Sequence, residues 1–254
     1  MDDDFAADNA ALQYVAWEKI SPTGIRSALG GLMLFDDPNF RNQAFNLGLV
    51  DAFCMKLESE LLKKQFHDER TPLPELAFLS AQSQMWIFAA YELMRSWRQR
   101  AKDMLKWAEN GGLEGKLAHL RRETSYQHVG RIIRASQIER VLADPEAIDK
   151  IRSDVRRTHM AFARMEAIRV SIAKHEVRGH KNSVANMPTM GIINRWSGSL
   201  DFELEHEQNI LGTISRRDIA DDIRAIPNIP LPSDDDIKSF DAYMRGPPPD
   251  LKWD

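Results

Sequence analysis

The sequence is poor in the cysteines that form disulfides and in the long apolar runs that span membranes. Its 254 residues include one cysteine, Cys54, so an internal disulfide and a zinc site built from several cysteines are both excluded. Because Cys54 lies in an apolar stretch, we expect a buried side chain rather than a reactive thiol. No run of 18 apolar residues occurs, and the first ten residues are acidic where a signal or transit peptide would be basic. We therefore expect a cytoplasmic protein with no membrane partner.

The sequence also lacks the common motifs of cofactor and catalytic sites. It has no P-loop, dinucleotide-binding glycine pattern, nucleophile elbow or paired-carboxylate signature. The segment KHEVRGHKN (174–182) is the nearest approach to a metal motif, but its histidines, His175 and His180, are five residues apart. The zinc-protease motif places two histidines four apart, on one helix face, and Gly179 is suited to end the helix here. We expect neither a bound metal nor a cofactor.

The net charge of -4 conceals an uneven distribution of charge. Residues 95–182 hold 20 Lys and Arg against 11 Asp and Glu, a balance of +9, and the remainder holds 14 against 27, a balance of -13. A basic middle between acidic ends favours either an anionic partner or docking of the acidic ends onto the middle, within one chain or between subunits. As candidate nucleic-acid contacts in this part we take Arg95, Arg98, Arg131 and Arg134.

Apolar periodicity predicts a mainly α protein, a bundle built on two long antiparallel helices. One helix covers residues 76–109, with an apolar stripe at steps of three and four. The stripe comprises Leu79, Ser83, Trp86, Ala90, Leu93, Trp97, Ala101, Met104 and Ala108. Met85 and Phe88 lie off it, so we expect the first half of the helix to be buried in the middle of the bundle. The second helix is expected to have Asp144 as its N-cap and to run for about thirty residues.

Farther along the chain, the period of the apolar residues changes from 3.6 to 2. Leu200, Phe202 and Leu204 alternate with acidic residues, which predicts a small C-terminal antiparallel β-meander. We expect four regions: short helices and loops over 1–37, a helical bundle over 38–182, the meander with a short helix over 183–226, and a proline-rich acidic tail over 227–254. The tail should contain a short capped helix beginning near Ser233.

Two segments place an arginine six residues before a histidine, RVSIAKH with Arg169 and His175 and RETSYQH with Arg122 and His128. A chain of two long antiparallel helices with such a motif near a helix end resembles HEPN-type domains, many of which are metal-independent ribonucleases of toxin and defence systems. The resemblance would cover roughly residues 40–180. It implies a histidine acting as general acid or base and an arginine that binds the scissile phosphate. Val170 follows Arg169, where the family more commonly has a polar residue.

Two functions remain open from the sequence. The first is a helical interaction protein, a homo-oligomer that joins through its long helices and holds a protein partner through the meander or the C-terminal tail. The alternative is a HEPN-like metal-independent ribonuclease or RNA-binding protein that uses the basic middle. Near the predicted hairpin, Arg195 and Trp196 form an exposed-looking pair, for which we expect packing against the helices.

Overall fold

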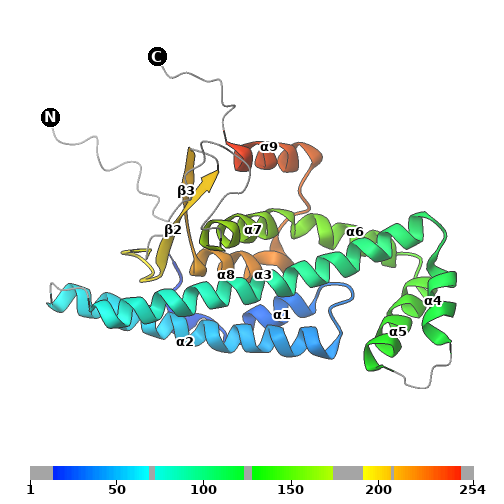
Figure 1. Cartoon of the computed structure of the whole chain (residues 1–254), viewed down its shortest axis with the longest axis horizontal. Helices are drawn as coiled ribbons and strands as arrows, with labels where there is room; N and C mark the ends of the chain where they lie inside the picture. The colour runs from blue at the N-terminus through cyan, green and yellow to red at the C-terminus, as the bar shows by residue number, and fades with distance from the viewer. Residues whose placement is uncertain (1–13, 69–71, 123–127, 174–190, 207–208, 247–254) are drawn as a thin grey trace, which may run out of the picture.

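One long helix, α3 (Leu73–Glu109), runs through the middle of the fold, and several of the other elements pack against it (Figure 1). The computed structural model describes residues 14–68, 72–122, 128–173, 191–206 and 209–246. In chain order the elements of these residues are η1 (Trp17–Lys19), α1 (Gly24–Gly30), α2 (Pro38–Asp68), α3 (Leu73–Glu109), α4 (Leu113–Arg121), α5 (Val129–Ala143), α6 (Ala147–Arg157), α7 (His159–Ala173), β1 (Ile192–Ile193), β2 (Leu200–His206), β3 (Asn209–Ser215), α8 (Arg216–Ala225), η2 (Ile226–Asn228) and α9 (Asp234–Arg245). The predicted class, mainly α with a small C-terminal antiparallel sheet, is confirmed.

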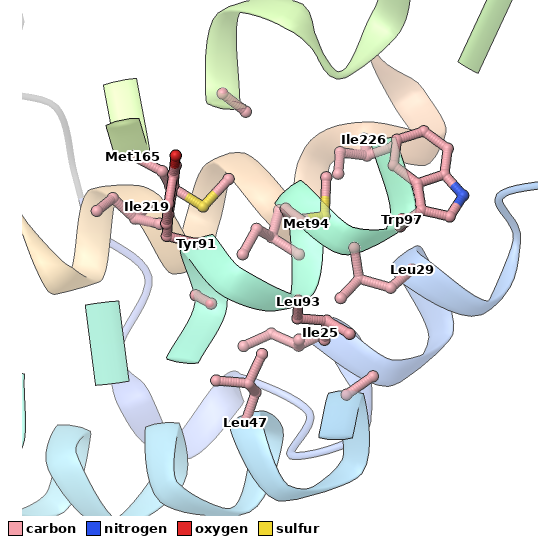
Figure 2. Packing of buried hydrophobic residues seen from close by; sticks show 14 of the residues in the cluster. Ile25, Leu29, Leu47, Tyr91, Leu93, Met94, Trp97, Met165, Ile219 and Ile226 are labelled. Carbon is pink, nitrogen blue, oxygen red and sulfur yellow. The ribbon is translucent and has the colours of Figure 1, made fainter. Parts of the chain in front are cut away.

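The core is formed where five helices meet the middle of α3. Figure 2 shows the α3 side chains of Leu93, Met94 and Trp97 among residues of the surrounding elements. These neighbours come from α1, α2, α7, α8 and η2, and the labelled ones are Ile25, Leu29, Leu47, Met165, Ile219 and Ile226. The predicted apolar stripe of α3 is buried from Leu79 to Met104, and its last member, Ala108, is half-buried.

Both tryptophans of this stripe are core residues, as predicted. Trp86 is 2% exposed and its Nε1 donates a hydrogen bond to the Leu47 carbonyl at 2.9 Å. Trp97 is fully buried and its Nε1 donates to the Met33 carbonyl at 2.8 Å. Each indole therefore buries a large apolar surface while its single donor is satisfied, which is the usual condition for a buried tryptophan. The two bonds also fix α3 against α2 and against the loop after α1.

The second long helix differs from the prediction. The thirty residues expected in one helix from Asp144 form two, α6 and α7, which are separated at Thr158. The Thr158 hydroxyl donates to the Asp154 carbonyl at 2.9 Å and accepts from Arg98 Nη1 at 2.7 Å. A threonine that bonds a carbonyl of the preceding turn favours a bend or break in a helix. The longest antiparallel pair is instead α2 and α3, which lie side by side (Figure 1).

The small sheet packs against the helices through one face of its central strand. Its order is β1-β2-β3, with both pairings antiparallel. The alternation seen in the sequence is confirmed, because Leu200, Phe202 and Leu204 are all buried. Strand β2 lies against α7 and α3. The helices therefore supply the apolar surface that a sheet of this size requires.

The connection between β1 and β2 is seated tightly on α2. We call residues 194–199 the 194–199 turn. Within it Gly198 has φ +74°, and a Cβ atom added there would lie 2.4 Å from the backbone carbonyl oxygen of Glu58. A side chain at this position is thus opposed both by the backbone conformation and by direct overlap with α2.

The tail forms the predicted capped helix, α9, after Ser233. The Ser233 hydroxyl accepts from the Asp236 backbone N–H at 3.1 Å, and the Asp236 carboxylate accepts from the Ser233 backbone N–H at 2.7 Å. None of the residues of α9 is fully buried. The helix is held by polar contacts, including His159 Nε2 with Asp241 Oδ1 at 2.7 Å. None of the helices in the described ranges is long and apolar enough to span a membrane.

Replacing Gly198 with alanine should destabilise the fold by about 2 kcal/mol or more, because the new Cβ meets the Glu58 carbonyl and the backbone is in the left-handed region. Urea unfolding would measure the loss. Gly115→Ala is the matched control, since a Cβ at Gly115 meets nothing within 4 Å and the residue lies in α4. A Gly198→Ala protein as stable as the Gly115→Ala protein would contradict the tight seating of the turn.

Candidate interaction surface

The first candidate catalytic pair, Arg169 and His175, is only half described. Arg169 lies in α7, with its guanidinium carbon 5.3 Å from the centroid of the Tyr91 ring. That distance is typical of a cation–π contact, which gives Arg169 a packing role against α3. His175 lies outside the described residues, so the pair stays a prediction.

The second candidate pair, Arg122 and His128, flanks the connection between α4 and α5. Arg122 is exposed just after α4, and His128 is the N-cap of α5. His128 Nδ1 accepts a hydrogen bond from the Gly130 backbone N–H at 3.1 Å. In the neutral ring the proton is then on Nε2, so only Nε2 could donate to another group. The structure thus assigns His128 a capping role; the catalytic role stays a prediction.

Arg98, a candidate nucleic-acid contact, is placed in the core instead. It is 5% exposed, and its Nη1 donates to the Val155 carbonyl at 2.8 Å. Its guanidinium carbon lies 4.8 Å from the centroid of the Phe162 ring. Burial lowers the pKa of Arg98 to about 10. The assignment of Arg98 to a nucleic-acid surface therefore needs correction, because its donors are directed toward α6 and Thr158, away from solvent.

The other three candidate arginines have partners within the chain. Arg95 is exposed and lies 2.7 Å from the Glu92 carboxylate. Arg131 donates to the His119 carbonyl at 3.0 Å, near the C-terminal end of α4, where cations satisfy unpaired carbonyl groups. Arg134 lies over the Trp107 ring, 5.6 Å from its centroid, and burial lowers its pKa. Of the four candidates, Arg95 is exposed, Arg131 and Arg134 are half-buried and Arg98 is buried.

A buried cluster of charges joins α2 to α8. The Arg216 side chain is fully buried, and its Nη2 lies 2.7 Å from Glu58 Oε1. It also pairs with Asp51, which receives a second arginine, Arg224. The Arg216 guanidinium carbon lies 5.5 Å from the Trp86 ring centroid. Because Arg216, Glu58 and Asp51 are closed to solvent, their ion pairs hold α2 and α8 together.

Cys54 lies beside this cluster and is buried, as predicted. It is 3% exposed, and burial raises the pKa of its thiol. Glu58 raises that pKa further, whereas Arg216 lowers it. Nothing in the described ranges groups three or more histidine, cysteine or acidic side chains in a way that could hold a metal ion.

Farther along α8, Asp222 is a carboxyl group with a shifted pKa. Its Oδ2 accepts from Arg164 Nη1 at 2.7 Å, which links α8 to α7. Burial raises the pKa of Asp222 to about 6, and the neighbouring carboxylates Asp218 and Asp221 act in the same direction, while Arg164 opposes them. The group serves an interhelical ion pair, so we assign it no catalytic role.

Exposed apolar side chains gather on the sides of α2 and α3 that face away from the core. We call this set the α2–α3 outer face; it comprises Phe45, Leu49, Val50 and Phe53 of α2 and Phe78 and Met85 of α3. Phe53 is 71% exposed and Met85 65% exposed. On α2, Phe45, Leu49 and Phe53 follow at steps of four, so they form one stripe along the helix. Large apolar side chains in this number are unusual on the surface of a monomer.

The α3 part of this face carries no charge. Between Leu76 and Tyr91 no residue is charged, and the exposed positions Ala77, Ala81 and Ala89 add only small apolar side chains beside Met85. Met85 was expected in the middle of the bundle, and that expectation is wrong. The described neighbours of α3, which include α2, α6, α7 and α8, leave the Met85 side of the helix open.

Replacing Arg216 with methionine should destabilise the protein by about 3 to 5 kcal/mol, because Glu58 and Asp51 would lose a buried counterion. Urea unfolding at neutral pH would measure the change. Arg95→Ala is the matched control, since its ion pair with Glu92 is exposed and should leave stability almost unchanged. Equal losses in the two variants would show that the buried cluster does not hold α8 on α2.

Comparisons with protein-family models, with curated proteins and with solved structures find no match for this chain. The resemblance to HEPN-type domains therefore remains a prediction from the sequence. The residues that the structure adds to the sequence-based candidates are those of the α2–α3 outer face. For Phe78 and Met85 the signal in the sequence is the absence of charge from Leu76 to Tyr91. Because this segment is longer than one helical turn, every side of α3 is uncharged there.

Proposed function

We propose that the chain is a helical interaction protein that self-associates through the α2–α3 outer face. The observation that carries this proposal is the combination of large apolar side chains and absent charge on an open helical surface. Phe78 is 57% exposed and Met85 65% exposed, and both lie in the uncharged segment of α3. Burying these side chains against another protein surface would be favourable through the hydrophobic effect.

The size of the face is suitable for a stable complex. If each large side chain presents about 200 Å² when open, the exposed fractions of its six members amount to roughly 650 Å². A specific protein interface of standard size buries about 800 Å² on each partner. The outer face thus approaches that area without any contribution from polar side chains around it.

A second copy of the chain is the partner that the charges favour. In a two-fold symmetric contact each surface meets itself, so a charge near the axis faces an identical charge. The uncharged segment avoids that repulsion over four turns of helix, from Leu76 to Tyr91. A strongly charged partner would find no complementary groups there.

The tail is the proposed contact for a different protein. Helix α9 has no fully buried residue and is held largely by polar contacts, such as Asp234 with Arg156 at 2.5 Å. A protein that co-purifies with the full chain and is lost when residues 233–254 are removed would support this assignment. Binding of nucleic acid has less support, because Arg98, Arg131 and Arg134 are engaged within the chain.

Met85→Glu should convert an assembled protein into a monomer of 29.1 kDa, because it places a charge in the uncharged segment. Light scattering over a range of concentrations would measure the mass. Lys102→Glu is the matched control, since Lys102 is exposed in the charged half of the same helix. The proposal fails if the unmodified chain is a monomer at every concentration, or if Met85→Glu assembles as the unmodified chain does.

A further inference from the structure

The α2–α3 outer face contains a side chain that can be modified chemically, the thioether of Met85. Met85 is 65% exposed, whereas none of the other methionines in the described ranges is exposed. Four of these are at most 2% exposed and three are half-buried; they are Met55, Met94, Met104 and Met165, and Met33, Met160 and Met244, respectively. Oxidation of a sulfur side chain follows its exposure to water. Among the described methionines, Met85 is thus the one that a dissolved oxidant reaches most readily.

The single thiol of the chain is shielded from the same oxidant. Cys54 is 3% exposed, and burial raises the pKa of its thiol. Peroxides react with the thiolate, so a buried thiol that stays protonated reacts slowly. The thioether of Met85 carries no proton and needs no such activation. Among the described residues it is therefore the sulfur at which oxidation should begin.

Oxidation would make Met85 polar in the part of the outer face that carries no charge. The product, methionine sulfoxide, has an oxygen that accepts hydrogen bonds. Ala81 and Ala89, one turn to either side of Met85, have no side-chain donor. Under another copy of the chain, the sulfoxide oxygen would lose its water and gain no partner from these neighbours. The oxidised face is consequently a much poorer surface for burial.

We propose that Met85 is an oxidation site through which a peroxide switches off the self-association of the chain. This inference rests on the proposed self-association and adds its regulation. In the reaction a lone pair of Met85 Sδ attacks one oxygen of hydrogen peroxide, so an S–O bond forms and the O–O bond breaks. The departing hydroxide takes the proton from the new S–OH group. The products are one sulfoxide and one water, with the sulfur oxidised by two electrons and the peroxide reduced by two.

Assembly and oxidation of Met85 should exclude each other. In the proposed assembly a second copy covers Met85, whereas in the single chain this side chain is 65% exposed. Peroxide therefore reacts with dissociated chains, and mass action makes their share smaller as the protein concentration rises. The rate of sulfoxide formation at Met85 should fall with concentration, while the rate at half-buried Met33, outside the outer face, should not. Peptide mapping by mass spectrometry would measure both rates.

Conversion of Met85 to the sulfoxide should weaken self-association at least about thirtyfold. A polar group buried without a partner costs about fivefold or more in affinity, and a two-fold contact buries Met85 of both copies. Light scattering over a range of concentrations would measure the effect before and after treatment with hydrogen peroxide. This oxidant suits the test because it oxidises thioethers and largely spares indoles. The indole of Trp196, which the sequence led us to expect against the helices, is 68% exposed.

Met85→Leu is the matched control, because leucine keeps an apolar side chain of similar size and has no sulfur. Its state of assembly should be the same before and after peroxide. Met85→Gln is polar and uncharged like the sulfoxide, so this variant should be dissociated without any oxidant, which separates the effect of polarity from damage at other residues. Methionine sulfoxide reductases, one for each epimer, should restore the assembly of the oxidised chain.

Two results would overturn the oxidation switch while self-association through the outer face stands. One is a protein that carries the sulfoxide at Met85 and assembles as the untreated chain does. The other is a Met85→Leu protein that peroxide dissociates as strongly as the unmodified sequence. If the untreated chain is a monomer at every concentration, both proposals fall.

Discussion

The fold depends on the burial of α3. One helix carries both core tryptophans and an apolar stripe of about eight turns, so it can be stable in water only when other elements cover it. Helix α2 covers one side, α6 and α7 another, and α8 packs on a third, while Ile25 and Leu29 of α1 lie beside Leu93 and Trp97. This arrangement explains why short elements far apart in the chain converge on Trp97 and its neighbours (Figure 2). It also explains the outer face, since α3 is apolar around more of its circumference than these neighbours cover.

Charged groups supplement the apolar core at places where helices distant in sequence must meet in one register. The Arg216 side chain pairs with both Glu58 and Asp51, and the Arg98 side chain binds Thr158, where α6 ends and α7 begins. A buried guanidinium is destabilising unless its donors are satisfied, so each of these contacts selects one relative position of the two helices. Arg98 belongs to the basic middle of the chain, so its positive charge is used for internal structure. Half-buried arginines of the same segment, such as Arg164 with Asp222, likewise pair with carboxylates of other helices.

The elements that were predictable are those whose signal is local. The stripe of α3, the alternation in β2 and the cap at Ser233 each depend on residues a few positions apart, and all three are confirmed. Three features were not predictable because their cause lies elsewhere in the chain. Thr158 interrupts a continuous helical pattern where it accepts a hydrogen bond from Arg98, 60 positions away, and the burial of Arg98 depends on a carbonyl 57 positions away. Met85 is exposed because of how many helices surround α3, which no pattern within α3 can reveal. The candidate site shows the same division. The absence of charge from Leu76 to Tyr91 can be read from the sequence, but the exposure of Phe78 and Met85 cannot.

The 194–199 turn places two residues with opposite constraints almost side by side. Gly198 touches the backbone of α2 and cannot carry a side chain without a change in the fold, whereas Trp196 is exposed and the fold does not need it. Natural selection would therefore act on position 198 through folding and on position 196 through binding alone. Among descendants of this chain the glycine should persist wherever the fold persists. The tryptophan is free to vary with the partner, so the turn can acquire a new specificity without any loss of stability.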